Sequence, residues 1–172
     1  MIIRLRKSLS IIPLGILCLA LTPDATNLTP PPGRMNVLPV RTLWVWERPE
    51  DLSTLDPRTT AIATLDHTIL LGRTATVIPR RQSFVYPAGI TRIAVVRVEA
   101  PGLIGPGLEH TVAGLVLDAL ADPGVAALQV DFDARRSQRA FYISVLRDLR
   151  RRMPPDLPLS ITALASWCSS DD

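Results

Sequence analysis

The clearest pattern in the chain is a nine-residue stretch, VAALQVDFD at 125–133, in which an apolar run ends in two acids. If this stretch is a β-strand, successive side chains point to opposite faces. One face then carries the bulkier apolar side chains of Ala126, Leu128, Val130 and Phe132. The other face carries small and polar residues and ends in Asp131 and Asp133. This division predicts a strand of a parallel sheet, with its bulky face under helices and two carboxylates at its carboxyl end.

A second stretch, RIAVVRVE at 92–99, repeats this pattern. Ala94, Val96 and Val98 share one face, while Arg97 and Glu99 share the other face near the carboxyl end. Two stretches with the same pattern predict that charged groups gather on one side of the sheet.

Helical spacing separates these strands. Val112, Leu115, Val116, Ala119 and Leu120 follow the i, i+3, i+4, i+7, i+8 pattern, and Phe141, Tyr142, Val145, Leu146 and Leu149 make a second stripe. The second helix has Ser137 as a candidate cap and ends before Pro154. Further strands are predicted at 41–47, where Trp44 and Trp46 share a face, and at 61–66 and 159–165, with a small hairpin at 68–79 around Gly72.

The alternation of strand, helix, strand, helix and strand from residue 92 onward is typical of parallel βαβ units. We therefore predict an α/β fold, a partial (β/α) barrel of about five parallel strands with a small β-hairpin insertion. A closed eight-stranded barrel takes about 250 residues, and this chain has 172. The alternative is an open parallel sheet.

The N-terminal segment indicates export. Residues 1–25 combine the basic Arg4, Arg6 and Lys7 with an apolar stretch from Leu9 to Leu21, as a signal peptide does. The predicted location is periplasmic or extracellular; a retained inner-membrane anchor is the alternative, although the apolar stretch is shorter than the roughly 20 residues that span a bilayer. Residues 26–39 are rich in proline and predict an extended linker. The domain itself is expected over 40–172.

Charge and cysteine content exclude some classes of protein. Without the charged residues of the leader, the 19 basic and 16 acidic residues become 16 and 15, so the chain gives no sign of nucleic-acid binding. Cys18 lies in the leader, which leaves Cys168 as the single cysteine of the mature chain. We therefore expect no intramolecular disulfide.

The acids at the strand ends are the candidate chemistry. Hydrolysis of a glycosidic bond requires a pair of carboxyl groups, one protonated and one ionised. The candidate catalytic residues are Glu99, Asp131 and Asp133. The candidate substrate-binding residues, which supply charge or a flat face for a sugar ring, are Trp46, Glu47, Arg97 and Trp167. The competing interpretation is structural: acids after strands cap helices, and Arg97 with Asp131 would form a buried ion pair.

Other chemistries have no motif in the sequence. The acids do not follow the spacing of a metal-binding loop, and His67 and His110 have no neighbouring ligand in sequence. A phosphate loop, a dinucleotide fingerprint and a nucleophile elbow are also absent from the sequence. We therefore predict no cofactor and no metal.

Four segments together carry a family resemblance: LWVWERPEDL, IPRRQSFVYPAGITRIAVVRVE, LQVDFDARRSQRAFYISVLRDLRRRMPP and LSITALASWC. Over about residues 42–168 the chain resembles a family of exported bacterial proteins of unknown function that are related to TIM-barrel glycoside hydrolases. The resemblance implies an exported barrel protein in which Asp131, Asp133 and Glu99 match polar positions at strand ends. It brings no catalytic assignment.

The chain departs from that family at its C-terminus, because family members continue past the SWC segment into further barrel strands. The expectation is therefore a truncated barrel. The function expected from the sequence is a glycoside hydrolase acting on an envelope or extracellular saccharide, with Asp131 or Asp133 as general acid. The alternative is a protein that binds a saccharide without catalysis, or an inactive truncated barrel that forms a homo-oligomer to cover its open strand edges.

Overall fold

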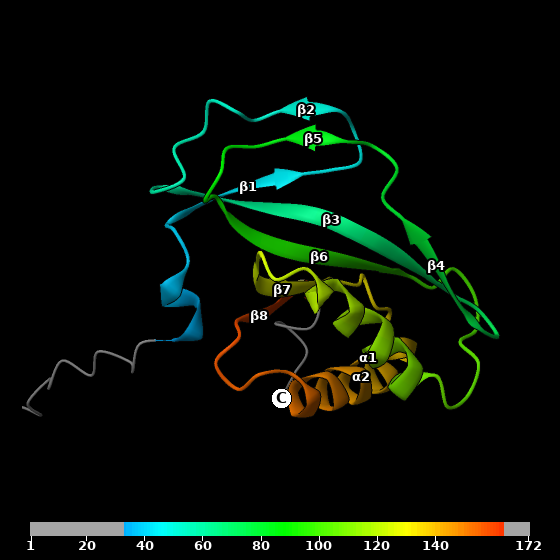
Figure 1. The fold of residues 1–172 in the computed structure, drawn as a ribbon. Coiled ribbons are helices and arrows are strands. Elements are labelled where there is room, and N and C mark those ends of the chain that lie inside the picture. The colour runs from blue at the N-terminus through cyan, green and yellow to red at the C-terminus, as the bar shows by residue number, and fades with distance from the viewer. Residues whose placement is uncertain (1–32, 164–172) are drawn as a thin grey trace, which may run out of the picture. The chain divides into compact units, whose positions relative to one another are not determined.

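The computed structural model describes residues 33–163, and Figure 1 shows their arrangement. Five parallel strands form a half-barrel in the order β1-β3-β6-β7-β8. These strands are β1 (Arg41–Val45), β3 (Thr60–Leu71), β6 (Thr91–Glu99), β7 (Val125–Asp131) and β8 (Leu159–Ile161). The predicted α/β half-barrel is confirmed.

Two helices cover one face of this sheet, α1 (Glu109–Asp118) and α2 (Arg139–Arg152) (Figure 1). Their buried residues join those of the strands in one core, which contains Val96, Leu128 and Val130 from the sheet and Val116 and Leu149 from the helices. The opposite, concave face carries a smaller cluster of Ala61, Ala63, Ile93, Val95 and Ala127. As the alternation in 92–99 and 125–133 predicts, the helix-side core holds Ala94, Val96, Leu128 and Val130, and the concave face holds Ile93, Val95 and Ala127. The alternation does not hold at the start of β7: the β6–β7 register shifts after Arg92, and Val125 packs against the helix-side core.

The predicted hairpin forms, but it is continuous with the strand before it. β3 runs without a break through the predicted boundary at Asp66, and its second half pairs antiparallel with β4 (Ala75–Pro79). β1 pairs with Thr60–Thr64 and β4 with His67–Leu71. One edge of β3 thus pairs with β1 along its first half and with β4 along its second, while the other edge pairs parallel with β6 through both halves.

A β-bulge at Asp66 joins the two halves of β3. Leu65 pairs with Val95 and His67 with Val96, so Asp66 is an extra residue in the ladder. Because of the extra residue, the odd-numbered side chains of β3 lie on one face of the sheet before Asp66 and on the opposite face after it. Ala61 and Ala63 lie in the concave cluster before the bulge, whereas Ile69 and Leu71 lie under the helices after it.

Two further strands were not predicted. β2 (Glu50–Asp51) and β5 (Phe84–Val85) form a separate two-stranded parallel sheet. Leu52, Leu55 and Phe84 from this region pack against a core cluster of Val45, Ile62 and Ile90. This small sheet therefore covers the outer face of β1 and the first half of β3.

Three short 3₁₀ helices complete the described part of the chain. Within the predicted linker, η1 (Arg34–Val37) is a 3₁₀ turn, and Leu38 packs against the concave cluster. η2 (Ala119–Ala121) extends α1. η3 (Arg136–Gln138) precedes α2, and Ser137 is not its cap: the side chain of Gln138 accepts a hydrogen bond from the backbone of Arg135 instead. The leader, residues 26–32, Leu164, Ala165, Trp167 and Cys168 lie outside the described residues.

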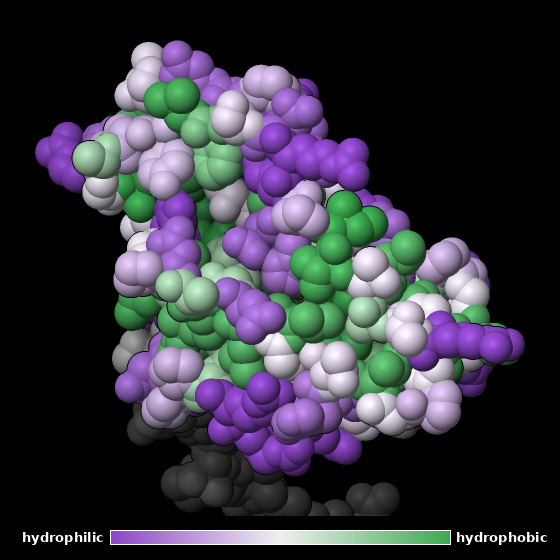
Figure 2. Space-filling model, turned by 45° about the vertical axis from the view of Figure 1, so that its right-hand side comes forward, coloured by the Kyte–Doolittle hydropathy of each residue, from purple (hydrophilic) through white to green (hydrophobic). Residues whose placement is uncertain are grey.

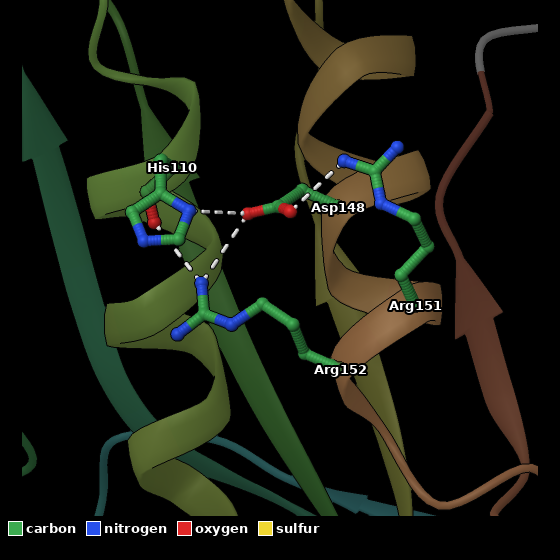
Figure 3. Close-up of polar contacts among 4 residues, drawn as sticks. All are labelled: His110, Asp148, Arg151 and Arg152. Atoms are coloured by element: carbon green, nitrogen blue, oxygen red, sulfur yellow. Dashed lines mark hydrogen bonds and ion pairs between the residues drawn. The ribbon is translucent and has the colours of Figure 1, made fainter.

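A polar cluster joins the two helices (Figure 3). Asp148 on α2 lies 2.9 Å from Nδ1 of His110 on α1 and also accepts hydrogen bonds from Arg151 and Arg152. Arg152 in addition donates to the carbonyl oxygen of His110. Arg151, with smaller contributions from His110 and Arg152, holds the pKa of Asp148 below its ordinary value despite the opposing effect of burial. The cluster therefore links α1 to α2 through one carboxylate that His110, Arg151 and Arg152 share.

Candidate functional site

The carboxyl ends of β6 and β7 form a small pocket of about 210 Å³. Glu99 lies at the end of β6 and Asp131 at the end of β7, while Asp133 follows two residues later. All three acids line the pocket, together with Arg97 and Arg135. Adjacent parallel strands end at the same edge, so acids that are distant in sequence meet here.

Arg97 pairs with an acid on its own strand. Its Nε lies 2.8 Å from Oε1 of Glu99, and both side chains are partly exposed. The sequence predicted that these two residues share a face, which is confirmed by their place in the pocket. The alternative interpretation of the sequence predicts a buried ion pair between Arg97 and Asp131. These two residues are register partners on neighbouring strands, but the ion pair of Arg97 is with Glu99.

Asp131 has a different partner. The hydroxyl of Thr162, just beyond β8, donates a hydrogen bond of 2.7 Å to Oδ1 of Asp131. The backbone N–H of Thr162 also donates to the carbonyl oxygen of Val130 and so continues the pairing of β7 with β8. Asp131 is half-buried, whereas Asp133 is exposed. The two aspartates therefore differ in environment, since one is held by a hydroxyl and the other faces solvent.

Buried Tyr142 lies behind this end of β7. Its hydroxyl donates to the carbonyl oxygen of Val130 at 3.3 Å, and its ring meets that of Phe132 edge to face at a centroid distance of 5.1 Å. Burial, together with the nearby charge of Asp131, raises the pKa of Tyr142 well above its ordinary value, so the phenol stays neutral. Tyr142 thus fixes the backbone from which Asp131 and Asp133 extend.

Two tryptophans extend the site toward β1. Trp44 and Trp46 stack with their ring centroids 5.5 Å apart, and the Arg97 guanidinium lies 5.1 Å from the centroid of the Trp46 ring. Trp44 is 41% exposed. The sequence correctly placed these rings on one face. The contact between Trp46 and Arg97 connects them to the pocket that holds the acids.

Glu47 lies apart from the three acids of the pocket. Its Oε1 accepts a hydrogen bond of 2.8 Å from the backbone N–H of Arg81. The neighbouring Arg80 donates to the carbonyl oxygens of Val45 and Arg48, and burial lowers the pKa of its guanidinium against the opposing charges of Glu47 and Glu50. Glu47 thus helps hold the segment that leads to β5.

Two residues of the site were not predicted. Arg135 lines the pocket from the loop after β7, and Thr162 supports Asp131 from the loop after β8. Strand alternation contains a signal for Thr162. Ser160 is the register partner of Gln129, so two positions further along each strand Thr162 lies beside Asp131 on the same face. Trp167, also a candidate, lies outside the described residues.

The described residues show no group suited to a metal ion and no helix suited to a membrane. Across 33–163, no cluster of three or more histidine, cysteine, aspartate and glutamate side chains is placed to hold a metal. In the same range, no helix is long and apolar enough to cross a bilayer.

Fold and site together define an α/β half-barrel with carboxylates, arginines and an aromatic pair at the carboxyl ends of its strands. Residues 91–172 match a family model described as a domain of unknown function (DUF3142). This match spans β6 through β8 and includes Arg97, Glu99, Asp131 and Asp133. No curated protein and no solved structure matches the chain.

Proposed function

We propose that this protein binds a saccharide at the carboxyl ends of β6 and β7 and hydrolyses a glycosidic bond there. The observation that carries the proposal is the shared pocket lined by Glu99, Asp131 and Asp133. Glycosidic bond hydrolysis needs one carboxyl group to protonate the leaving oxygen and another to act as base or nucleophile. Three acids in one pocket supply both roles.

The contacts divide these roles among the acids. Glu99 is engaged by Arg97 at 2.8 Å, so we assign the general acid to one of the two aspartates. Asp131 is oriented by Thr162. Asp133 is exposed and lines the same pocket, so its carboxyl group is accessible to a substrate.

The aromatic pair supports a saccharide as ligand. The stacked Trp44 and Trp46 offer a flat surface next to charged groups, which suits the apolar face and hydroxyl edge of a sugar ring. Figure 2 shows hydrophobic residues reaching the surface in patches between hydrophilic ones on one face of the molecule.

We further propose that the protein is exported and meets an envelope or extracellular saccharide. The support is the sequence of residues 1–25, with a basic start followed by an apolar stretch.

The test compares Asp131→Asn and Asp133→Asn with the wild type, for binding and for hydrolysis of envelope and plant-type polysaccharides. Loss of hydrolysis by a factor of about 10² or more, with binding retained, supports catalysis. A wild type that hydrolyses none of these glycans, or aspartate variants that hydrolyse at the wild-type rate, contradicts it.

A second candidate function is saccharide binding without catalysis, which the exposed Trp44 and its stacking on Trp46 favour. In that case Trp46→Ala weakens saccharide binding. The wild type binds the glycan without hydrolysing it, and the two aspartate variants do the same.

A further inference from the structure

A second and larger depression lies beside the acidic pocket. It has a volume of about 500 Å³ and lies between the loop at 101–108 and the start of α2. Leu103, Ile104 and Phe141 provide apolar lining, and Glu109, Arg135 and Ser137 provide polar groups. The proposed reaction uses none of this lining.

The two depressions are neighbours. Arg135 lines both, and the chain passes from Ala100 and Pro101 in the acidic pocket directly to Gly102 in the second depression. A ligand long enough to extend from one depression to the other would cross the exposed side chain of Arg135.

The walls of the second depression are held in place by backbone contacts. The N–H of Gly105 donates a 2.8 Å hydrogen bond to the carbonyl oxygen of Gly72 in the β3–β4 turn. A Cβ at Gly105 would lie 2.5 Å from the carbonyl oxygen of Arg73, so this close approach needs glycine. Gly107 follows with φ of 74°, a conformation that favours glycine. The loop is thus anchored next to Leu103.

The boundary between the two depressions is also fixed. The buried Gln138 donates from Nε2 to the carbonyl oxygen of Ala100 at 3.0 Å and accepts from the N–H of Arg135 at 2.9 Å. These bonds tie the end of β6 to the loop after β7. The relative position of the two depressions is therefore set before any ligand arrives.

Leu103 has no role in the core, because its side chain is 93% exposed. A large apolar side chain held in solvent on an anchored loop gains from contact with a ligand that covers it. The acidic pocket alone, at about 210 Å³, is below the roughly 300 Å³ at which ligand pockets begin, and the two depressions together fall within the usual range.

We infer that the ligand is an oligosaccharide of at least two units, with one unit among the acids and the next against Leu103, Ile104 and Phe141. This inference rests on the proposed function and adds the size of its substrate. Arg135 lies at the junction of the two units, where its guanidinium donates hydrogen bonds to sugar hydroxyls.

The test measures calorimetric binding of chitin-, cellulose- and α-glucan-derived oligosaccharides of one to four units to the full chain. We expect the wild type to bind two or more units of the recognised series at least about tenfold more tightly than one unit. Leu103→Ser removes this gain and leaves the affinity for a single unit unchanged. Val37→Ser is the matched control, since Val37 is 72% exposed and lies on η1, away from both depressions.

Two results overturn the inference and are distinguishable. Affinity that does not depend on chain length, or a Leu103→Ser variant that keeps the full gain, refutes the two-unit ligand and leaves the proposed function standing. A wild type that binds none of the three series at any length refutes the proposed function and the inference together.

Discussion

The hydroxyl of Thr162 donates a 2.7 Å hydrogen bond to Oδ1 of Asp131, across the junction between β7 and β8. This bond fixes one carboxylate of the pocket, while Asp133 two residues away remains exposed. The strand pairing does not depend on the hydroxyl, because the backbone N–H of Thr162 bonds to Val130 independently.

Thr162→Val should therefore affect the site more than the fold. We expect an unfolding free energy within about 1 kcal/mol of the wild type, because the strand pairing is kept. Saccharide affinity or turnover should fall about tenfold or more, because Asp131 loses its orientation. Denaturant unfolding and a binding or activity assay measure the two effects. Thr162→Ser keeps the hydroxyl and should behave as the wild type, whereas equal losses in both variants would contradict the role given to the bond.

Leu128→Ala tests the core under the helices. Leu128 is fully buried between the sheet and the two helices, so its truncation leaves a cavity and should cost about 2 to 5 kcal/mol of unfolding free energy. Urea titration followed by circular dichroism measures this. The matched control is Leu103→Ala, which removes the same atoms from an exposed site and should change stability by less than about 0.5 kcal/mol. A similar cost for both variants would contradict the packing described.

Gly105→Ala tests the close approach of the loop to the β3–β4 turn. The added methyl group meets the backbone of Arg73, so one of the two segments must shift, at a cost of about 1 to 3 kcal/mol. Gly102→Ala is the control, because a Cβ there meets nothing within 4 Å. Thermal unfolding and hydrogen exchange at residues 101–108 distinguish them. Equal stability and exchange in the two variants would show that the loop is not anchored at Gly105.

Asp148→Asn tests the polar link between α1 and α2 (Figure 3). The pKa of Asp148 is lowered in the folded protein, chiefly by Arg151, so its charge stabilises the fold above the unfolded pKa of about 3.9 and ceases to do so as the pH falls through the folded value. The variant should be less stable than the wild type at pH 6, and the difference should shrink below about pH 4.

Denaturant titrations from pH 2 to pH 7 measure this dependence. Asp156→Asn serves as control, because Asp156 is exposed in the loop after α2. A stability difference between wild type and Asp148→Asn that stays constant across the pH range would contradict the electrostatic role.

The sequence predicted those parts of the fold that repeat a regular period. Alternation in 92–99 and 125–133 gave the correct faces for Val96, Leu128 and Val130, because a strand has one side-chain period and the core needs bulky residues. The same alternation brought Glu99, Asp131 and Asp133 to one edge, where they share a pocket. Their catalytic role stays a prediction.

The features that the sequence missed are short or depend on contacts between distant segments. β2 and β5 have two residues each, too few to show a period, and their pairing joins segments that are distant in sequence. The choice of Glu99 over Asp131 as partner of Arg97 depends on side-chain conformation, since both acids lie within reach of that arginine along or across the strands. The cap predicted at Ser137 failed because Gln138 reaches back to Arg135.

The extra residue in the β3 ladder makes insertions and deletions unequal in their effects. Removing Asp66 would leave an unbulged strand in which His67 and all later residues keep their present neighbours on β4 and β6. If one more residue were inserted there and joined the regular strand pairing, the side chains of Ile69 and Leu71 would turn to the opposite face and leave the core under the helices. Loss of Asp66 therefore keeps the facing of the later residues of β3, whereas a further residue keeps it only if the bulge enlarges to hold it.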